Sequence, residues 1–156
     1  NTKGNRSVYI SADGNQGIVK WYQPTEKEEE DFGKGIFTFP LIGAVDMHIG
    51  SGKSNSGIIL SSGYNCPAAA LCNALSMEGY NDWFLPSESE LIELMSTPRD
   101  NMVNKFIPGW YWSSSEEESG VRNAFVVNIW TGSIFWSMTV GKHEEYHVRC
   151  YRTDKY

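Results

Sequence analysis

His143, Glu144 and His147 match the H-E-x-x-H pattern of zinc proteases. In that chemistry both imidazoles bind one zinc ion and the glutamate acts on the metal-bound water, and this spacing brings the histidines together only on a helix. Here the motif follows Gly141 and continues into the alternating segment 148–152, which favours a loop that enters a strand. In an extended chain the histidines would lie ~13 Å apart, too far for one zinc ion. We therefore expect no metal site here.

Residues 50–54, with the sequence GSGKS, match the last part of a phosphate-binding P-loop. The full motif is absent, because Met47 stands where the first glycine is required. A P-loop also opens a helix, whereas residues 55–57 predict a turn and residues 58–60 predict a strand. We expect a surface loop rich in glycine and serine.

Nucleophilic catalysis is no better supported by the sequence. No serine lies in a G-x-S-x-G elbow, and the serines at 113–115 have no sequence signal for an activating base. We therefore predict that the chain is not an enzyme and that it needs no cofactor.

The three cysteines allow at most one disulfide and one free thiol, and they lack the spacing of a zinc knuckle. Cys66 and Cys72 lie six residues apart, near or on one predicted helix. They would face opposite sides of that helix, so they are poor partners for each other. Cys150 is the better candidate for a bridge.

Composition limits the partners of the chain. Thirteen basic and nineteen acidic residues give a formal net charge of −6, which opposes attachment to nucleic acid or anionic lipid. No stretch approaches the roughly 18 apolar residues of a membrane span, so we expect no membrane insertion by this segment. The chain begins at Asn1 without a methionine or the apolar core of a signal peptide. We interpret the chain as a mature or excised segment.

Two helices are predicted in the middle of the chain. The first begins near Pro67 and ends at Gly79, with an apolar stripe between them. The second follows Pro86, where Ser87 and Glu90 form a capping box in which each side chain bonds the other residue's free backbone N–H. The acidic run 25–31 predicts a solvated loop or a short exposed helix.

The two ends of the chain predict strands. Residues 8–10 and 17–22 flank an Asp-Gly turn and predict a hairpin. After residue 109 short alternating runs predict four strands, with a hairpin turn at 131–132 and a polar loop at 114–120. These strands cover 110–113, 124–130, 133–140 and 147–152. Without a repeat or linker, residues 1–156 are expected to form a single domain.

Several motifs occur in an order that resembles a known family. They are GSG with SN at 50–55, AALC at 69–72, DWFLPS with EL at 82–91, YWSSSE at 111–116, AF at 124–125, Gly132 and VRCYR at 148–152. Together they resemble the C-terminal domain family of the Legionella collagen-like adhesin, over nearly the whole chain.

The resemblance implies an α+β domain with a fold like that of C-type lectins and the formylglycine-generating enzyme. Two helices would pack on a small, twisted, mostly antiparallel sheet, in an exported bacterial or phage protein. The resemblance thus implies a secreted or cell-surface location, with lipoprotein anchoring through a removed N-terminal segment as one option. It also implies a disulfide between Cys72 and Cys150, from the first helix to the last strand. The calcium-site signatures of true C-type lectins are not recognisable, and the catalytic cysteines of the enzyme relative have no match. The acidic charge of the chain opposes the sulfated glycans associated with the adhesin.

Ligand-binding residues are expected on the late strands, where aromatic rings stand among polar groups. We predict Trp130, Phe135, Tyr146, Asn123, Asn128 and His143 as the binding set. The alternative is that these are ordinary half-buried side chains. If the strands alternate regularly, Phe125, Val127 and Ile129 form the core face of one strand and Trp136 lies on the apolar face of the next. Trp83 and Trp112 are assigned to the core by the family pattern.

The leading hypothesis is an adhesin-type recognition domain that binds a glycan or a host or partner protein through its late strands and loops. A second is a hypervariable receptor-binding domain of a phage or surface protein. A third, of a different class, is an enzyme related to the formylglycine-generating enzymes.

Overall fold

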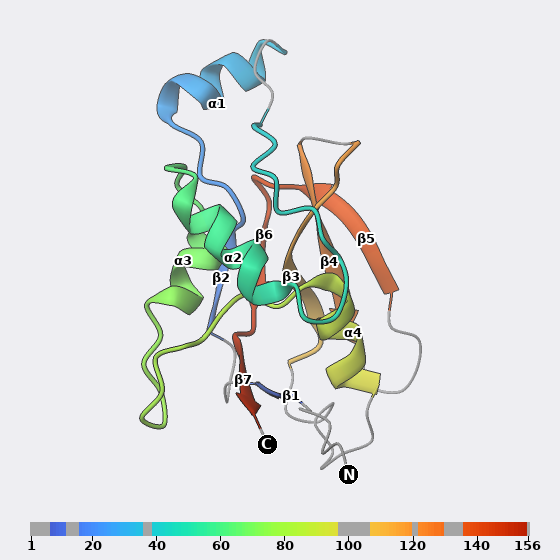
Figure 1. Ribbon diagram of the computed structural model, residues 1–156. Coiled ribbons are helices and arrows are strands. Elements are labelled where there is room, and N and C mark those ends of the chain that lie inside the picture. The colour runs from blue at the N-terminus through green and yellow to red at the C-terminus, as the bar shows by residue number, and fades with distance from the viewer. Residues whose placement is uncertain are drawn as a thin grey trace.

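The computed structural model describes residues 7–11, 16–35, 39–96, 107–119, 122–129 and 136–155, and within these ranges it is an α+β structure as expected (Figure 1). The strands are β1 (Ser7–Ser11), β2 (Gly17–Lys20), β3 (Gly109–Glu116), β4 (Asn123–Ile129), β5 (Trp136–Gly141), β6 (Glu145–Val148) and β7 (Tyr151–Lys155). The helices are α1 (Glu26–Gly33), α2 (Gly52–Ser61), α3 (Pro67–Asn73) and α4 (Glu88–Ser96).

Five strands form a mixed sheet in the order β2-β6-β3-β4-β5, in which only β3 and β6 run parallel. The strands β1 and β7 pair separately, at the end of the molecule opposite α1 (Figure 1). The predicted N-terminal hairpin is therefore wrong, because β1 pairs with β7 and β2 with β6. A turn signal is local, whereas the backbone groups of these short strands are satisfied by the far end of the chain.

The late strands are confirmed with two corrections. The predicted strand 147–152 is divided, because the chain leaves β6 at Val148 and enters the other sheet at Tyr151. Between them, the Cys150 N–H bonds the Gln16 side chain at 2.9 Å instead of a neighbouring strand. The predicted turn 131–132 lies outside the described residues.

The second correction concerns the start of the predicted polar loop 114–120. Ser114, Ser115 and Glu116 belong to β3 and are buried. Their polar groups have partners inside the protein: the Asn55 amide donates to the Ser114 hydroxyl at 3.3 Å, and the Ser115 hydroxyl donates to the Asp46 carbonyl at 2.9 Å. Hydrogen bonding offsets the penalty of burying polar groups, so their polarity was a poor guide to exposure.

Residues 50–60 form neither the predicted surface loop nor the predicted strand. Residues 52–61 form the helix α2 instead. The buried residues of this helix are Gly52, Asn55, Ser56 and Ile59, a helical spacing composed mostly of polar side chains. The Gly52 N–H at its start donates to the Glu90 carboxylate at 2.9 Å. An internal carboxylate thus occupies the helix N-terminus, where a P-loop would hold phosphate.

The other helices follow the sequence more closely. The predicted first helix begins at Pro67 as α3 but ends early, at Asn73. The capping box of α4 is confirmed: the Glu90 N–H donates to Ser87 Oγ at 3.3 Å, and the Ser87 N–H donates to Glu90 Oε2 at 3.4 Å. The acidic run forms the short helix α1, which has no buried residue.

Two buried clusters cover both faces of β4. Ala124 and Val126 join the larger cluster with Trp112, whereas Val127 and Ile129 join a second one with Leu91 of α4. A strand covered on both faces lacks a single core face, so the prediction of one such face was incomplete. Trp83 and Trp112 lie in the larger cluster, as expected.

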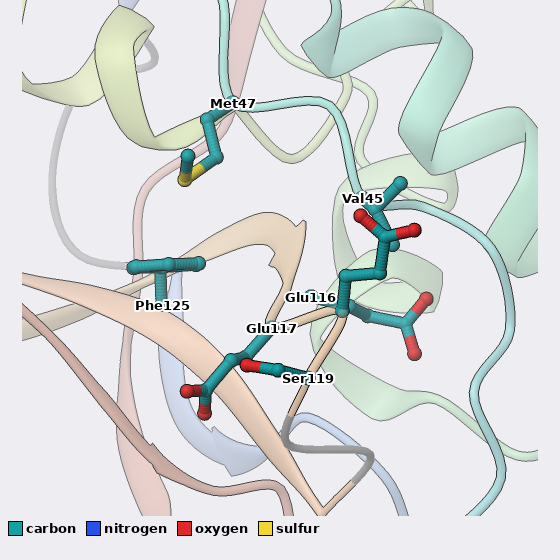
Figure 2. Close-up of a pocket in the computed structure, with 7 residues that line it drawn as sticks. Val45, Met47, Glu116, Glu117, Ser119 and Phe125 are labelled. Carbon is teal, nitrogen blue, oxygen red and sulfur yellow. The ribbon is translucent and has the colours of Figure 1, made fainter.

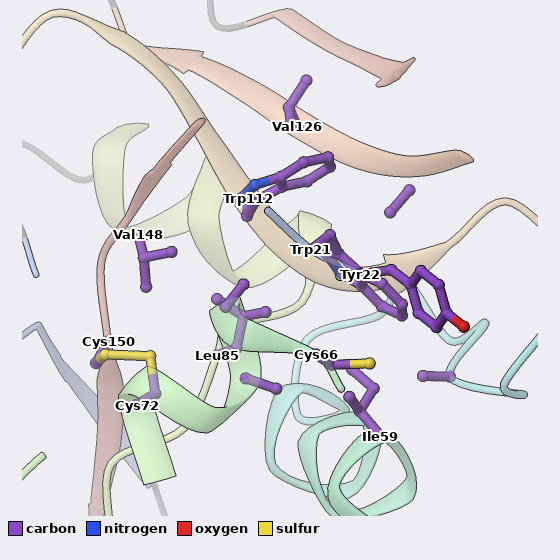
Figure 3. Packing of buried hydrophobic residues seen from close by; sticks show 14 of the residues in the cluster. Trp21, Tyr22, Ile59, Cys66, Cys72, Leu85, Trp112, Val126, Val148 and Cys150 are labelled. Atoms are coloured by element: carbon purple, nitrogen blue, oxygen red, sulfur yellow. A yellow bond between two sulfur atoms is a disulfide. The ribbon is translucent and has the colours of Figure 1, made fainter. Parts of the chain in front are cut away.

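A disulfide joins α3 to the chain just before β7. Cys72 and Cys150 form this bridge across 78 residues, and the larger cluster packs around it (Figure 3). It is the pairing that the family resemblance implied. Cys66 is a free, buried cysteine in the same cluster.

Removing the disulfide with Cys72→Ala/Cys150→Ala should lower the free energy of unfolding by about 2–4 kcal/mol, because the bridge closes a long loop in the unfolded chain. Urea unfolding measures this. Cys66→Ala, which also removes a buried thiol but leaves the bridge intact, is the control and should lose about 1 kcal/mol. Equal losses in the two variants would show that the bridge adds no stability.

Gly52 should not tolerate a side chain. A methyl group there would lie 2.5 and 2.6 Å from the Glu90 carboxylate oxygens and 2.8 Å from the Ser87 nitrogen, so Gly52→Ala should destabilise by about 1–3 kcal/mol. Gly57→Ala on the same helix meets nothing within 4 Å and should stabilise by about 0.5–1 kcal/mol. Thermal unfolding of the pair tests this, and equal effects would contradict the packing of Glu90 against α2.

Candidate functional site

The structure separates two of the residues predicted to bind a ligand. Asn123 and Asn128 lie near opposite ends of β4, five positions and therefore about 17 Å apart along the strand. In the register with β5, Asn123 is opposite Gly141 and Asn128 is opposite Trp136. Trp130 and Phe135 lie outside the described residues. The described part of the chain therefore does not test the predicted set as a whole.

His143 and Tyr146 pack against aromatic rings of the interior. The His143 ring stacks on Phe39 with centroids 5.3 Å apart and also contacts Phe32 at 5.0 Å. The Tyr146 ring meets Trp112 edge-on at 5.1 Å, and its hydroxyl donates to Glu144 at 2.6 Å. Both side chains are half-buried.

The zinc-protease pattern does not lie on the helix that its chemistry requires. His143 lies in the turn after β5, whereas His147 lies within β6 and stacks on Tyr111 at 5.0 Å. The predicted loop that enters a strand is confirmed. Across the described ranges, no group of three or more His, Cys, Asp or Glu side chains could hold a metal ion.

A hollow of about 450 Å³ lies where the end of β3 and the start of β4 meet the segment before α2. Met47 and Phe125 point toward one another across it, and Glu117 and Ser119 border it (Figure 2). Its lining residues are Val45, Met47, Glu116, Glu117, Glu118, Ser119 and Phe125. We call the apolar side chains of Val45, Met47 and Phe125 the floor of the hollow, and the polar residues Glu117, Glu118 and Ser119 its rim.

A buried ion pair builds one wall of this hollow. The carboxylate of Glu116, at the end of β3, accepts hydrogen bonds from the backbone N–H groups of Ile42, Gly43 and Ala44 at 2.9, 2.8 and 2.8 Å. It also accepts from the Lys142 ammonium at 2.5 Å. Both side chains are fully buried. This carboxylate therefore holds the chain that leads into Val45.

Lys142 has further partners that stabilise its charge. The ammonium donates to the Pro40 carbonyl at 2.9 Å and lies 4.8 Å from the centroid of the Trp21 ring. Burial lowers the pKa of Lys142, and the hydrogen bond and charge of Glu116 oppose that shift. A buried pair of this kind persists only when hydrogen bonds replace the lost hydration of both groups, and these contacts supply them.

The free thiol nearby is poorly suited to nucleophilic chemistry. Burial raises the pKa of Cys66 to about 12, with the charge of Lys142 opposing the shift. The thiolate, which is the reactive form, is therefore scarce at neutral pH.

One predicted residue, Asn123, contacts the rim without lining the hollow. The Asn123 amide donates to Glu117 Oε2 at 2.9 Å and so orients this carboxylate beside the hollow. Phe125, at the start of the same strand, is half-buried and was expected only in the core. Sequence reasoning missed Val45 and Met47, because their segment has no regular structure and becomes a wall only through contacts remote in sequence.

Breaking the buried pair should be costly. Lys142→Met leaves a buried carboxylate without its cation, and Glu116→Gln leaves the ammonium without its anion. Each change should lower the free energy of unfolding by about 3–5 kcal/mol. The double variant should lose at least about 1 kcal/mol less than the sum of the single losses. Urea unfolding of the four proteins gives this coupling, and strictly additive losses would contradict a direct interaction.

Comparison with known proteins places this architecture in a family. The family model described as the Lcl C-terminal domain matches residues 13–152. No curated protein matches the chain. Among the described residues, no helix has the length and apolar character needed to cross a membrane. Because the matched residues run from before β2 into β7 and include the disulfide and the hollow, they confirm the expected resemblance. The chain belongs to the Lcl C-terminal domain family.

Proposed function

We propose that this chain is an adhesin-type recognition domain of a secreted or cell-surface protein, and that it binds a glycan or protein ligand in the hollow beside Phe125. The observation that carries the proposal is the combination of an apolar floor with a polar rim in one concave site. Apolar floors supply contact area, and a few placed polar groups supply direction and specificity.

The rigidity of the surrounding structure supports a binding role. One wall is held by the buried Glu116–Lys142 pair, and Phe125 is carried by a strand that is paired on both sides. A site that is already ordered loses little conformational entropy when a ligand binds. The hollow is thus suited to recognition without a conformational change.

Two further features fit the proposal. The Cys72–Cys150 disulfide suits a protein exposed to an oxidising environment outside the cytoplasm. The connection it makes, from a helix to the chain before the final strand, supports a C-type-lectin-like arrangement. The high pKa of Cys66 argues against a thiol-dependent enzyme.

The proposal is tested by measuring how the labelled domain binds a glycan array and a panel of cell surfaces. Met47→Ala and Phe125→Ala should each weaken a detected interaction by about fivefold or more, because they remove the floor. Met138→Ala is the matched control for Met47→Ala: Met138 is 46% exposed, against 40% for Met47, and it does not line the hollow.

Trp130→Ala and Phe135→Ala form a second arm of the same comparison. If these variants lose binding while the folded Met47 and Phe125 variants keep it, the ligand binds elsewhere and the hollow is not the site.

A further inference from the structure

The charge of the hollow is concentrated on two residues of its rim. Glu116 contributes no free charge there, because its carboxylate is paired with Lys142. Within the described part of the chain, neither Glu117 nor Glu118 forms an ion pair. The residues that line the hollow include no lysine or arginine. Among the described residues no cation pairs with these two carboxylates, so a bound group meets both negative charges beside an apolar floor.

The carboxylate of Glu117 is held in place. Asn123 donates to its Oε2 atom, and no described residue donates a side-chain hydrogen bond to its Oε1 atom. Glu118, the next residue, is exposed. Both residues line the hollow, so their two negative charges lie close to any group bound on its floor.

The apolar floor fits the stem of a long basic side chain. Lysine and arginine lay their methylene groups along apolar surface while the charged head stays with polar partners. Met47 has a flexible thioether that adapts to such a stem, and the face of Phe125 attracts a cation that lies over it. An anionic ligand would be repelled, whereas a neutral sugar could donate hydroxyl hydrogen bonds to the carboxylates but brings no positive charge to balance them.

We propose that the group bound in the hollow is a lysine or arginine side chain of a protein ligand, an inference that rests on the proposed function. The formal net charge of −6 acts in the same direction, because it favours the approach of a basic surface. The negative charges of Glu117 and Glu118 favour a basic protein segment over a glycan as the ligand.

The test follows the backbone amide signals of the ¹⁵N-labelled domain during titration with four short peptides, Gly-X-Gly with blocked ends. The central residue X is lysine, arginine, norleucine or glutamate, and methyl glycosides form a separate arm. Lysine and arginine peptides should shift the amides at 45–47, 117–119 and 125. The norleucine peptide, which keeps the stem and lacks the cation, should bind at least about fivefold more weakly. The glutamate peptide should not bind.

A charge-matched pair of variants locates the effect. Glu117→Gln/Glu118→Gln should weaken lysine-peptide binding by about fivefold or more, and the glutamine at 117 can still accept from Asn123. Glu26→Gln/Glu145→Gln removes the same charge at two exposed positions away from the hollow. Its affinity should stay within about twofold of the wild type.

The outcomes separate this inference from the proposed function. Equal binding of norleucine and lysine, or equal loss in the two double variants, would overturn the cationic ligand. Shifts of the hollow amides by a glycoside alone would overturn it too, while leaving the hollow as a recognition site. If no probe shifts these amides, the inference fails, and the cell and glycan comparison with Met47→Ala decides separately whether the hollow binds anything.

Discussion

The carboxylate of Glu116 joins three parts of the chain that are remote in sequence. Glu116 is the last residue of β3, and its carboxylate accepts hydrogen bonds from the backbone N–H groups of residues 42–44 and pairs with Lys142 in the turn after β5. Both charges are fully buried, so neither could keep its present place without the other. The chain that carries Val45 and Met47 is consequently fixed beside the start of β4, and the hollow exists because of this restraint.

Two restraints of different chemistry act at different places in the fold. The disulfide ties α3 to the chain before β7, while the ion pair ties the segment before α2 to the ends of β3 and β5. The rim residues Glu118 and Ser119 are exposed and belong to neither restraint. Substitutions at such exposed positions change stability little, so the rim can determine which ligand is bound while the restraints preserve the shape of the site.

The sequence predicted what local chemistry determines. The capping box at Ser87, the late strands and the loop that enters a strand at 143–147 followed from short patterns and are seen in the structure. The helix α2 was missed because its buried face is largely polar. The N-terminal hairpin was predicted wrongly because each of its strands pairs with a strand at the far end of the chain. The hollow could not be predicted, since Glu116 is one of three consecutive glutamates and only tertiary contacts show which of them is buried.

Hydrogen exchange of the amides of Ile42, Gly43 and Ala44 tests the central claim most directly. These residues lie outside regular helices and strands, so their protection depends on the carboxylate that accepts their hydrogen bonds. The account predicts that they exchange as slowly as the paired amides between β3 and β4. Exchange as fast as that of the exposed residue Glu118 would show that the buried ion pair does not hold this segment.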